Sequence, residues 1–302
     1  MKTLPVAKLA LLLFVLFGAG VLFFALPGPS LSRTEASAGE VAPVFGADLV
    51  NFAHRGASEA APENTFAAFD RAVADGADVL ELDVRLTADG EAVVIHDATV
   101  DRTTDGSGPV GAMSLTELRA LDAGYRFGGA AHPYRSAGLT VPTLAEVLAR
   151  YPSLYLNVEI KDKGPRLARR VAEVLARADS ERRVLVVSQD HATVRAFRKA
   201  SGGRVATGAS EREARYFCLL SQLGLSALAR PEYEALQLPE EFQGRPVVTE
   251  KLLLAASRKG IRVDVWTLDS PQEMREALDL GVSGIITGNP RYLSELRDSG
   301  SA

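Results

Sequence analysis

The chain has 302 residues, of which 47% are hydrophobic and 24% are charged, a composition that allows a sizeable core and excludes global disorder. Its formal net charge is -4 and no long basic run occurs, so we expect no nucleic acid among its partners. Cys218 is the single cysteine, which excludes an intrachain disulfide and a cysteine-based zinc site. It lies in the apolar run 216–220, where we expect a buried thiol.

An uncharged apolar run lies near the start of the sequence. Leu9–Leu26 spans 18 residues, and as a helix it would be about 27 Å long, close to the hydrocarbon thickness of a bilayer. We therefore predict that residues 1–29 form an uncleaved, single-pass transmembrane helix that anchors the chain. Lys2 and Lys8 precede the run, so the positive-inside rule places the rest of the chain on the extracytoplasmic side. Ala36-Ser37-Ala38 has the pattern of a signal-peptide cleavage site, which leaves secretion as the alternative.

Residues 30–47 are rich in Ser, Ala, Gly and Pro, which predicts a flexible tether. Residues 48–298 alternate short apolar runs with helical patterns, and this α/β alternation predicts one (β/α)8 TIM barrel. The predicted strands are Leu49–Ala53, Val79–Val84, Leu154–Ile160, Val184–Ser188, Val205–Thr207, Ala235–Leu238, Ile261–Trp266 and Gly284–Thr287. The predicted helices are Thr65–Ala74, Leu144–Arg150, Pro165–Arg177, His191–Ala200, Glu250–Lys259 and Pro271–Leu280, and their expected N-caps include Asn64, Thr143 and Ser270. The alternative, an open doubly wound sheet, normally carries a glycine-rich fingerprint after its first strand, and none is present.

The repeat is interrupted after the second strand. Ala88-Asp89-Gly90 is a good turn, and we predict that Glu91–His96 after it forms an extra strand that pairs back. The polar stretch Thr99–Ser136 follows and contains a short predicted helix at Thr116–Leu121. We interpret residues 97–140 as a small insertion over one mouth of the barrel.

Charged and aromatic side chains gather at the carboxyl ends of the predicted strands, where barrel enzymes build their sites. These residues are His54, Arg55, Glu81, Asp83, His96, Glu159, Lys161 and Trp266. Glu81 and Asp83 are two residues apart, so their side chains share one face of the strand, where two carboxylates are costly to bury without a cation. Glu159 and Lys161 repeat this spacing on the third strand.

The residue types indicate phosphate-ester chemistry. Clusters of carboxylate oxygens favour a hard divalent cation such as Mg2+ or Ca2+. Arg or Lys beside such a cation favours a phosphate group. Two histidines supply a general acid and a general base near neutral pH. The combination fits hydrolysis of a phosphate ester, in which the metal offsets negative charge in the transition state.

Simpler interpretations exist for several of these residues. The two carboxylates of the second strand could pair with Arg71 or Arg85, and Glu159 could form only an ion pair with Lys161. Trp266, taken alone, could pack in the core. The two remaining histidines, which we expect at the surface, are His132 and His191.

The ordered set of motifs resembles the signature of the glycerophosphodiester phosphodiesterase family over Leu49–Leu296. The motifs are His54-Arg55-Gly56, Pro62-Glu63-Asn64-Thr65, Glu81-Leu82-Asp83-Val84, His96-Asp97, Asp101-Arg102-Thr103-Thr104, Pro142-Thr143-Leu144, Glu159-Ile160-Lys161, Val265-Trp266-Thr267 and Gly284-Ile285-Ile286-Thr287. The resemblance implies a (β/α)8 barrel with a small insertion after the second strand. It also implies one divalent cation, Ca2+ or Mg2+, on Glu81, Asp83 and Glu159.

The resemblance further implies roles for individual residues. The implied general acid/base pair is His54 and His96. The implied substrate-binding residues are Arg55 and Lys161 at the phosphate and Trp266 on the pocket wall. Glu63 would orient the groups that touch the substrate. The positions that depart from the family pattern, and so bear on substrate preference rather than activity, are Asp269, Ser283 and Gly288.

The function expected from the resemblance is metal-dependent hydrolysis of glycerophosphodiesters such as glycerophosphocholine, which gives glycerol 3-phosphate and an alcohol. Lysophospholipids are the alternative substrates, in a lysophospholipase D-type reaction, because the apolar stretch Tyr216–Leu228 could form a lip at the mouth instead of an ordinary core helix. A catalytically inactive phosphodiester-binding module is a remote alternative, because every acid/base and carboxylate residue is present. The sequence leaves open Ca2+ or Mg2+, water or the glycerol 2-hydroxyl as nucleophile, and the oligomeric state.

Overall fold

The computed structural model describes residues 49–300 of the chain. The predicted membrane anchor (1–29) and tether (30–47) lie outside the described residues, so both stay predictions. In the described part, no helix combines the length and the apolar character that a bilayer crossing requires.

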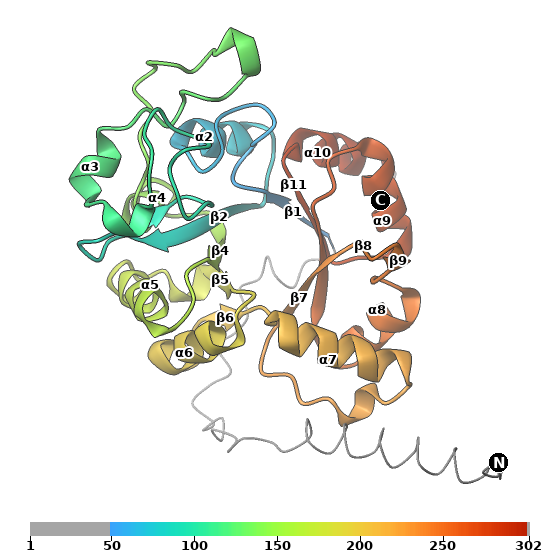
Figure 1. Cartoon of the computed structure of the whole chain (residues 1–302). Helices are drawn as coiled ribbons and strands as arrows, with labels where there is room; N and C mark the ends of the chain where they lie inside the picture. Colours follow the sequence, from blue (N-terminus) through green and yellow to red (C-terminus); the bar gives the residue numbers. More distant parts are fainter. Residues whose placement is uncertain (1–48, 301–302) are drawn as a thin grey trace, which may run out of the picture. The chain divides into compact units, whose positions relative to one another are not determined.

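Eight parallel strands close into a barrel (Figure 1). In spatial order they are β6 (Ala206–Thr207), β5 (Val184–Val187), β4 (Tyr155–Ile160), β2 (Val79–Leu86), β1 (Val50–Ala53), β11 (Gly284–Thr287), β10 (Arg262–Trp266) and β7 (Ala235–Pro239). A parallel bridge between Gly208 and Ala235 joins the two ends of this order. The closure confirms the predicted (β/α)8 barrel and shows that the open doubly wound alternative is wrong, because an open sheet would keep two unjoined edges.

The barrel interior is a packed core. β1, β5 and β11 are buried along their whole length. This is expected for barrel strands, because helices cover their outer face and the side chains of the barrel interior pack on their inner face. Gly284 has no room for a side chain, because a Cβ there would lie 2.5 Å from Asp264 Oδ1 and 2.7 Å from the ring of Phe52. Asp264 is itself buried and paired with Arg262, whose Nη2 donates to Oδ1 at 2.7 Å.

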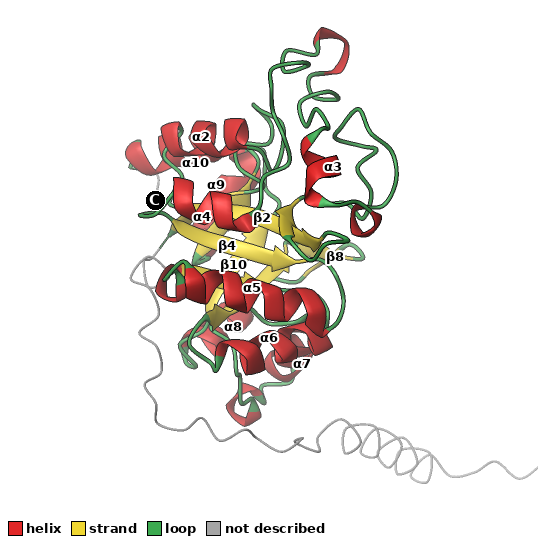
Figure 2. Ribbon diagram, turned by 90° about the vertical axis from the view of Figure 1, so that its left-hand side faces the viewer, coloured by secondary structure: helices red, strands yellow, loops and turns green. Residues whose placement is uncertain are grey.

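Helices cover the outside of the barrel (Figure 2). They are α2 (Phe66–Ala74), α4 (Leu144–Arg150), α5 (Pro165–Arg177), α6 (His191–Ser201), α7 (Glu211–Gln222), α8 (Glu250–Ser257), α9 (Pro271–Leu280) and α10 (Pro290–Asp298). Thr143 and Ser270 cap α4 and α9 as predicted, each in a capping box with the glutamate three residues on. The predicted cap Asn64 is wrong, because its neighbour Thr65 caps α2 and accepts from the N–H of Ala68.

A hairpin carries the chain from the second barrel strand to the insertion. β2 continues beyond its pairing with β4 and pairs antiparallel with β3 (Ala92–Val94), which confirms the extra strand but makes it shorter than Glu91–His96. The N–H of Ile95 donates to the carbonyl of Asp83 (3.0 Å), so the ladder fixes the backbone next to His96. The elements between β3 and α4 are η2 (Val110–Ala112), α3 (Leu115–Arg119) and η3 (Gly129–Ala131).

Three elements were not predicted from the sequence. They are α7, α10 and the short hairpin of β8 (Glu241–Phe242) and β9 (Arg245–Pro246). From the sequence we considered a helix only for Tyr216–Leu228, whereas α7 begins at Glu211, after a capping box of Ser210 and Glu213. The stretch Tyr216–Leu228 is therefore not an ordinary core helix: it comprises the end of α7 and the one-turn helix η5 (Ser226–Leu228), both with exposed leucines.

Candidate active site

A cavity of about 670 Å³ opens at the carboxyl ends of the strands. The predicted site residues on its wall are His54, Arg55, Glu81, His96, Glu159, Lys161 and Trp266. Asp83 and Glu63 lie directly behind Arg55, at 3.2 and 3.0 Å from its guanidinium. All the predicted site residues therefore meet at one mouth, although β2, β4, β10 and the segments after β1, β3 and β4 supply them.

Three carboxylates form the centre of this mouth. Glu81, Asp83 and Glu159 each offer an oxygen, and these oxygens lie within 4.8 Å of one another. The strand register produces the cluster, since Asp83 lies opposite Glu159 in the β2–β4 ladder and Glu81 shares its face. Glu81 and Asp83 are buried and Glu159 is half-buried. An oxygen-only set of this size suits Mg2+ or Ca2+, so these residues fit the divalent cation that the family resemblance implies.

Asp83 is the most heavily contacted of the three carboxylates. Its side chain is 1% exposed and lies 3.2 Å from Arg55 Nε and 3.3 Å from Lys161 Nζ. The side-chain amide of Asn64 donates to it at 2.9 Å. Burial by itself would raise the pKa of Asp83, but Lys161 and Arg55 outweigh burial and hold that pKa below its ordinary value.

Glu81 has the opposite electrostatic setting. Its carboxylate accepts the backbone N–H of Arg55 at 2.8 Å, and no side chain of the described residues forms an ion pair with it. Burial, followed by the charges of Asp83 and Glu159, raises the pKa of Glu81 well above its ordinary value. Like charges about 4.8 Å apart repel by on the order of 3 kcal/mol at an effective dielectric of about 20. Arg55 and Lys161 supply two positive charges for these three carboxylates, so a bound cation would offset the repulsion that remains at Glu81.

The loop after β1 directs its groups toward the carboxylates through two residues with left-handed backbone. Arg55 has φ +54° and Asn64 has φ +58°, a region that costs energy for side chains other than glycine. The N–H of Asn64 donates to the carbonyl of Arg55 at 2.9 Å, so the two residues hold each other. As a result both the backbone and the side chain of Arg55 face the cluster, while the amide of Asn64 fixes Asp83. The sequence motif Pro62-Glu63-Asn64-Thr65 was the only available signal for this role.

The two histidines lie in different environments. Burial, followed by the charge of Arg55, lowers the pKa of His54 to about 4, so His54 is neutral near pH 7. His96 Nδ1 lies 2.6 Å from Asp97 Oδ1. Hydrogen bonds from Arg102 outweigh burial and hold the pKa of Asp97 below its ordinary value, so Asp97 is an ionised acceptor. His96 therefore donates through Nδ1, and its Nε2 is left to exchange protons.

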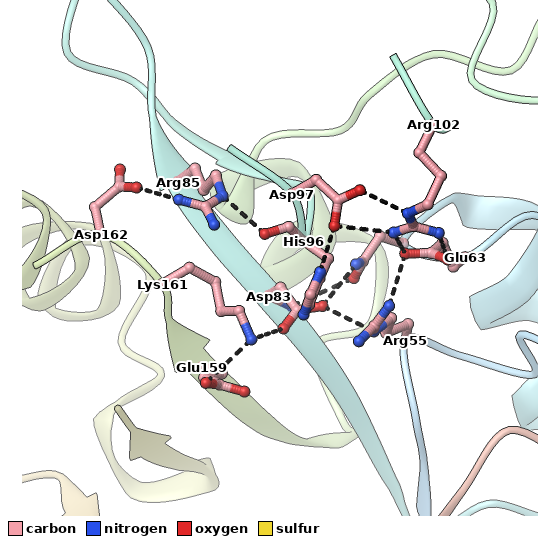
Figure 3. A network of polar contacts seen from close by, with 11 residues as sticks. Arg55, Glu63, Asp83, Arg85, His96, Asp97, Arg102, Glu159, Lys161 and Asp162 are labelled. Carbon is pink, nitrogen blue, oxygen red and sulfur yellow. Dashed lines mark hydrogen bonds and ion pairs between the residues drawn. The ribbon is translucent and has the colours of Figure 1, made fainter. Parts of the chain in front are cut away.

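Arg102, which the sequence argument assigned no role, connects both halves of the site (Figure 3). Its guanidinium donates to Asp97 Oδ2 at 2.6 Å and to Glu63 Oε2 at 2.6 Å. Glu63 in turn accepts from Arg55 Nη1 at 3.0 Å. One side chain from the segment after β3 thus positions the carboxylate behind His96 and the carboxylate behind Arg55. Its only sequence signal was a place in the motif Asp101-Arg102-Thr103-Thr104.

The simpler interpretations are wrong for Arg71, Arg85 and Trp266, and hold only in part for Lys161. Arg71 pairs with Asp75 at 2.7 Å and Arg85 with Asp162 at 2.6 Å, so neither neutralises the carboxylates of β2. Lys161 does pair with Glu159, at 3.1 Å, but it contacts Asp83 as well and so belongs to the cluster. Trp266 is 39% exposed and lies on the cavity wall, so the core interpretation is wrong.

The residues that depart from the family pattern pack outside the cavity wall. Asp269 accepts the N–H of Gly288 at 2.7 Å and ties the β10 loop to the end of β11. Gly288 lets the loop after β1 approach, because a Cβ there would lie 2.9 Å from Ser58 Oγ. Ser283 Oγ accepts the N–H of Val263 at the other end of the strands. His132 and His191 also lie off the wall. Both are half-buried, whereas the sequence argument expected them at the surface.

Part of the cavity wall is apolar. Its residues include Val187, Cys218, Leu219, Leu238 and Ile286. Cys218 is only half-buried and faces this cavity, which corrects the expectation of a core thiol. Burial raises the pKa of the Cys218 thiol, so it stays protonated and acts as an apolar wall group.

Comparison with known proteins assigns the barrel to one family. The model of the glycerophosphoryl diester phosphodiesterase family matches residues 54–292, nearly the whole barrel. The chain belongs to the glycerophosphodiester phosphodiesterase family. It is therefore an enzyme of that class, and the alternative of an inactive binding module is set aside.

Relatives match the barrel almost over their whole length. A glycerophosphodiester phosphodiesterase of Caldanaerobacter subterraneus is 37% identical over 81% of this chain and 96% of its own. One of Bacillus altitudinis is 32% identical over 82% and 97%. The solved glycerophosphodiester phosphodiesterase of Agrobacterium tumefaciens is 29% identical, with a TM-score of 0.67 over 81% of this chain and 98% of that one. A phosphodiesterase of Oleispira antarctica, solved with the product sn-glycerol-3-phosphate, is 25% identical, with a TM-score of 0.64 over 82% and 96%.

Replacement of Arg102 by Met should lower kcat for a soluble glycerophosphodiester by about 10–100-fold, the usual effect of removing a group that orients catalytic residues. Arg102→Lys keeps the charge but not the forked geometry, so it should recover only part of the rate. Arg119→Met is the matched control, since Arg119 is similarly exposed and pairs with Glu146 away from the cavity. Steady-state kinetics and urea unfolding of all three variants separate catalysis from stability. An Arg102→Met enzyme with wild-type kcat would contradict the positioning role.

Proposed function

We propose that the chain hydrolyses glycerophosphodiesters to glycerol 3-phosphate and an alcohol, with one bound divalent cation, Ca2+ or Mg2+. The observation that carries the proposal is the meeting of three carboxylates, two histidines and two cationic side chains in one cavity mouth. The Oleispira antarctica relative solved with sn-glycerol-3-phosphate supports this choice of product.

The phosphate group would lie between the cationic side chains and the carboxylate cluster. Arg55 and Lys161 both face the cavity and would contact the phosphate oxygens. The cation held by Glu81, Asp83 and Glu159 would offset negative charge that develops on phosphate. Trp266 on the rim would line the part of the pocket that receives the alcohol.

The contrast between the histidines assigns their roles. His54 is neutral at pH 7, so it would accept the proton of the nucleophile as the new oxygen–phosphorus bond forms. His96 is held at Nδ1 by the ionised Asp97, so its Nε2 would carry the proton that passes to the alcohol oxygen as the ester bond breaks. The nucleophile is water or the free glycerol 2-hydroxyl, and the latter would give a cyclic phosphate first. The appearance of that cyclic product in a quenched reaction distinguishes the two routes.

The direct test is release of glycerol 3-phosphate from glycerophosphocholine. We expect release by the wild-type enzyme, loss of release with EDTA, and recovery with Ca2+ or Mg2+. His54→Ala and His96→Ala should each lower kcat by at least about 100-fold, the lower scale of acid/base catalysis. His132→Ala and His191→Ala are the controls, since neither lines the cavity. Retained activity in both catalytic-histidine variants would overturn the assignment.

Lysophospholipids are a second candidate substrate, in a lysophospholipase D-type reaction. The apolar wall that includes Leu219 and Leu238 favours it, because glycerophosphocholine has no acyl chain to contact that wall. Replacing Leu219 by Gln should lower kcat/KM for lysophosphatidylcholine roughly tenfold or more, in line with about 1.5–3 kcal/mol for a buried leucine. The same change should leave glycerophosphocholine hydrolysis nearly unchanged, as should the control Leu254→Gln on α8. An equal effect on both substrates would count against the lipid substrate.

We also propose that residues 1–29 anchor the chain in a membrane, with the barrel on the extracytoplasmic side. Support comes from the sequence alone, namely the apolar run Leu9–Leu26 and the preceding Lys2 and Lys8. The chain should remain in the membrane fraction after a high-salt wash and leave it only with detergent. Recovery of a shortened chain in the external medium would support signal cleavage and secretion instead.

A further inference from the structure

The exposed apolar side chains of the barrel are concentrated in one region. Ten large apolar side chains are exposed among the described residues, and six of them lie on α7, the turn after it, η5 and β8. We call these six the α7 face: Tyr216, Leu219, Leu223, Leu225, Leu228 and Phe242. The guanidinium of Arg215 lies over the ring of Phe242, 5.6 Å from its centroid, which joins the β8–β9 hairpin to α7. Contiguous exposed apolar surface of this kind marks an interaction site.

The apolar side of α7 is wider than the part that packs against the barrel. Tyr216, Leu219 and Leu223 follow one another at three and four residues, so they form one stripe along the helix. Their side chains are 43%, 48% and 58% exposed. Phe217 and Leu220, on the adjoining part of the helix surface, are buried in the core. Packing against the barrel therefore does not explain the outer stripe.

The α7 face is continuous with the mouth of the catalytic cavity. Leu219 and Phe242 belong to the face and also line the cavity that contains both catalytic histidines. Leu223, Leu225 and Leu228 extend the same apolar surface away from the mouth and do not line it. A fluid lipid surface pressed against this face could deliver an amphiphilic molecule into the mouth, whereas a rigid protein partner would cover it.

The part of the chain outside the described residues favours a lipid surface as the occupant. It contains the uncharged run Leu9–Leu26, whose length matches a bilayer. Residues 27–48 separate that run from the barrel, and this number of residues can span up to roughly 75 Å. Such a connection is long enough for the barrel mouth to meet the same membrane. The face is flanked by both signs of charge, Arg215 and Glu211 being paired with each other, so apolar contact rather than net charge would drive docking.

We propose that the α7 face is a docking surface for a phospholipid bilayer, and that docking brings single-chain phosphodiester lipids to the catalytic cavity. The second part rests on the function proposed above, while the docking itself does not. A docked α7 face would place the apolar cavity wall of Leu219 next to acyl chains and the carboxylate cluster next to the phosphate.

The test uses residues 36–302, because the solved relatives match 95–99% of their own length to the barrel and so show that it folds without the preceding segment. The variant carries Leu223→Asp and Leu228→Asp, neither of which touches the cavity. Leu254→Asp is the control, since Leu254 is 54% exposed on α8, outside the face. Binding to phosphatidylcholine vesicles is measured by co-sedimentation. We expect the wild type and the control to bind, and the double variant to bind at least tenfold more weakly.

Glycerophosphocholine hydrolysis should be the same in all three proteins, which shows that the double variant retains its fold and its site. Wild-type protein that does not sediment with vesicles, or a double variant that binds as well as wild type, would overturn the proposal. Binding only when anionic lipid is added would overturn it in favour of a charged contact. Light scattering that shows a wild-type dimer and a monomeric double variant would assign the face to self-association instead. Absence of hydrolysis with intact vesicle binding would overturn the proposed function and leave docking in place.

Discussion

The structure depends on how one buried carboxylate, that of Asp83, is neutralised. A carboxylate this buried is stable only when cations and hydrogen-bond donors surround it, and Arg55, Lys161 and Asn64 meet that requirement. These partners come from two segments distant from Asp83 in sequence, so their convergence fixes the loop after β1 and the end of β4 against β2. The groups that stabilise Asp83 are also those that would hold a phosphate, and for this reason the same contacts serve folding and catalysis.

The hairpin after β2 extends this arrangement to the second histidine. β3 pairs with β2, and the N–H of Ile95 donates to the carbonyl of Asp83, so the next residue, His96, is held beside the strand that carries the cluster. Arg102 then bridges Asp97 and Glu63 and ties the segment after β3 to the loop after β1. A chain of ion pairs thus connects His96, through Asp97, Arg102 and Glu63, to Arg55, the residue next to His54.

The barrel and the carboxylate cluster were predictable because they follow from local rules. Alternating apolar runs indicate parallel strands, and the two-residue spacing of Glu81 and Asp83 places both on one face. Asn64 was misassigned as a cap, because its role depends on a left-handed backbone that spacing does not reveal. α7 was anticipated only in part, as a core helix over Tyr216–Leu228, because the capping box of Ser210 and Glu213 that begins the helix was not weighed. The contacts of Arg102 are tertiary and have no local pattern.

The central claim is that Glu81, Asp83 and Glu159 bind a divalent cation that offsets their mutual repulsion. The most direct measurement is isothermal titration calorimetry with Ca2+ and with Mg2+ on the wild-type protein, on Glu81→Gln and on the exposed control Glu232→Gln. The account predicts about one bound cation per chain for the wild type and the control, and no binding heat for Glu81→Gln, because two carboxylates are too few for tight binding of a hard cation. Equal binding by the wild type and Glu81→Gln, or no binding by any of them, would contradict it.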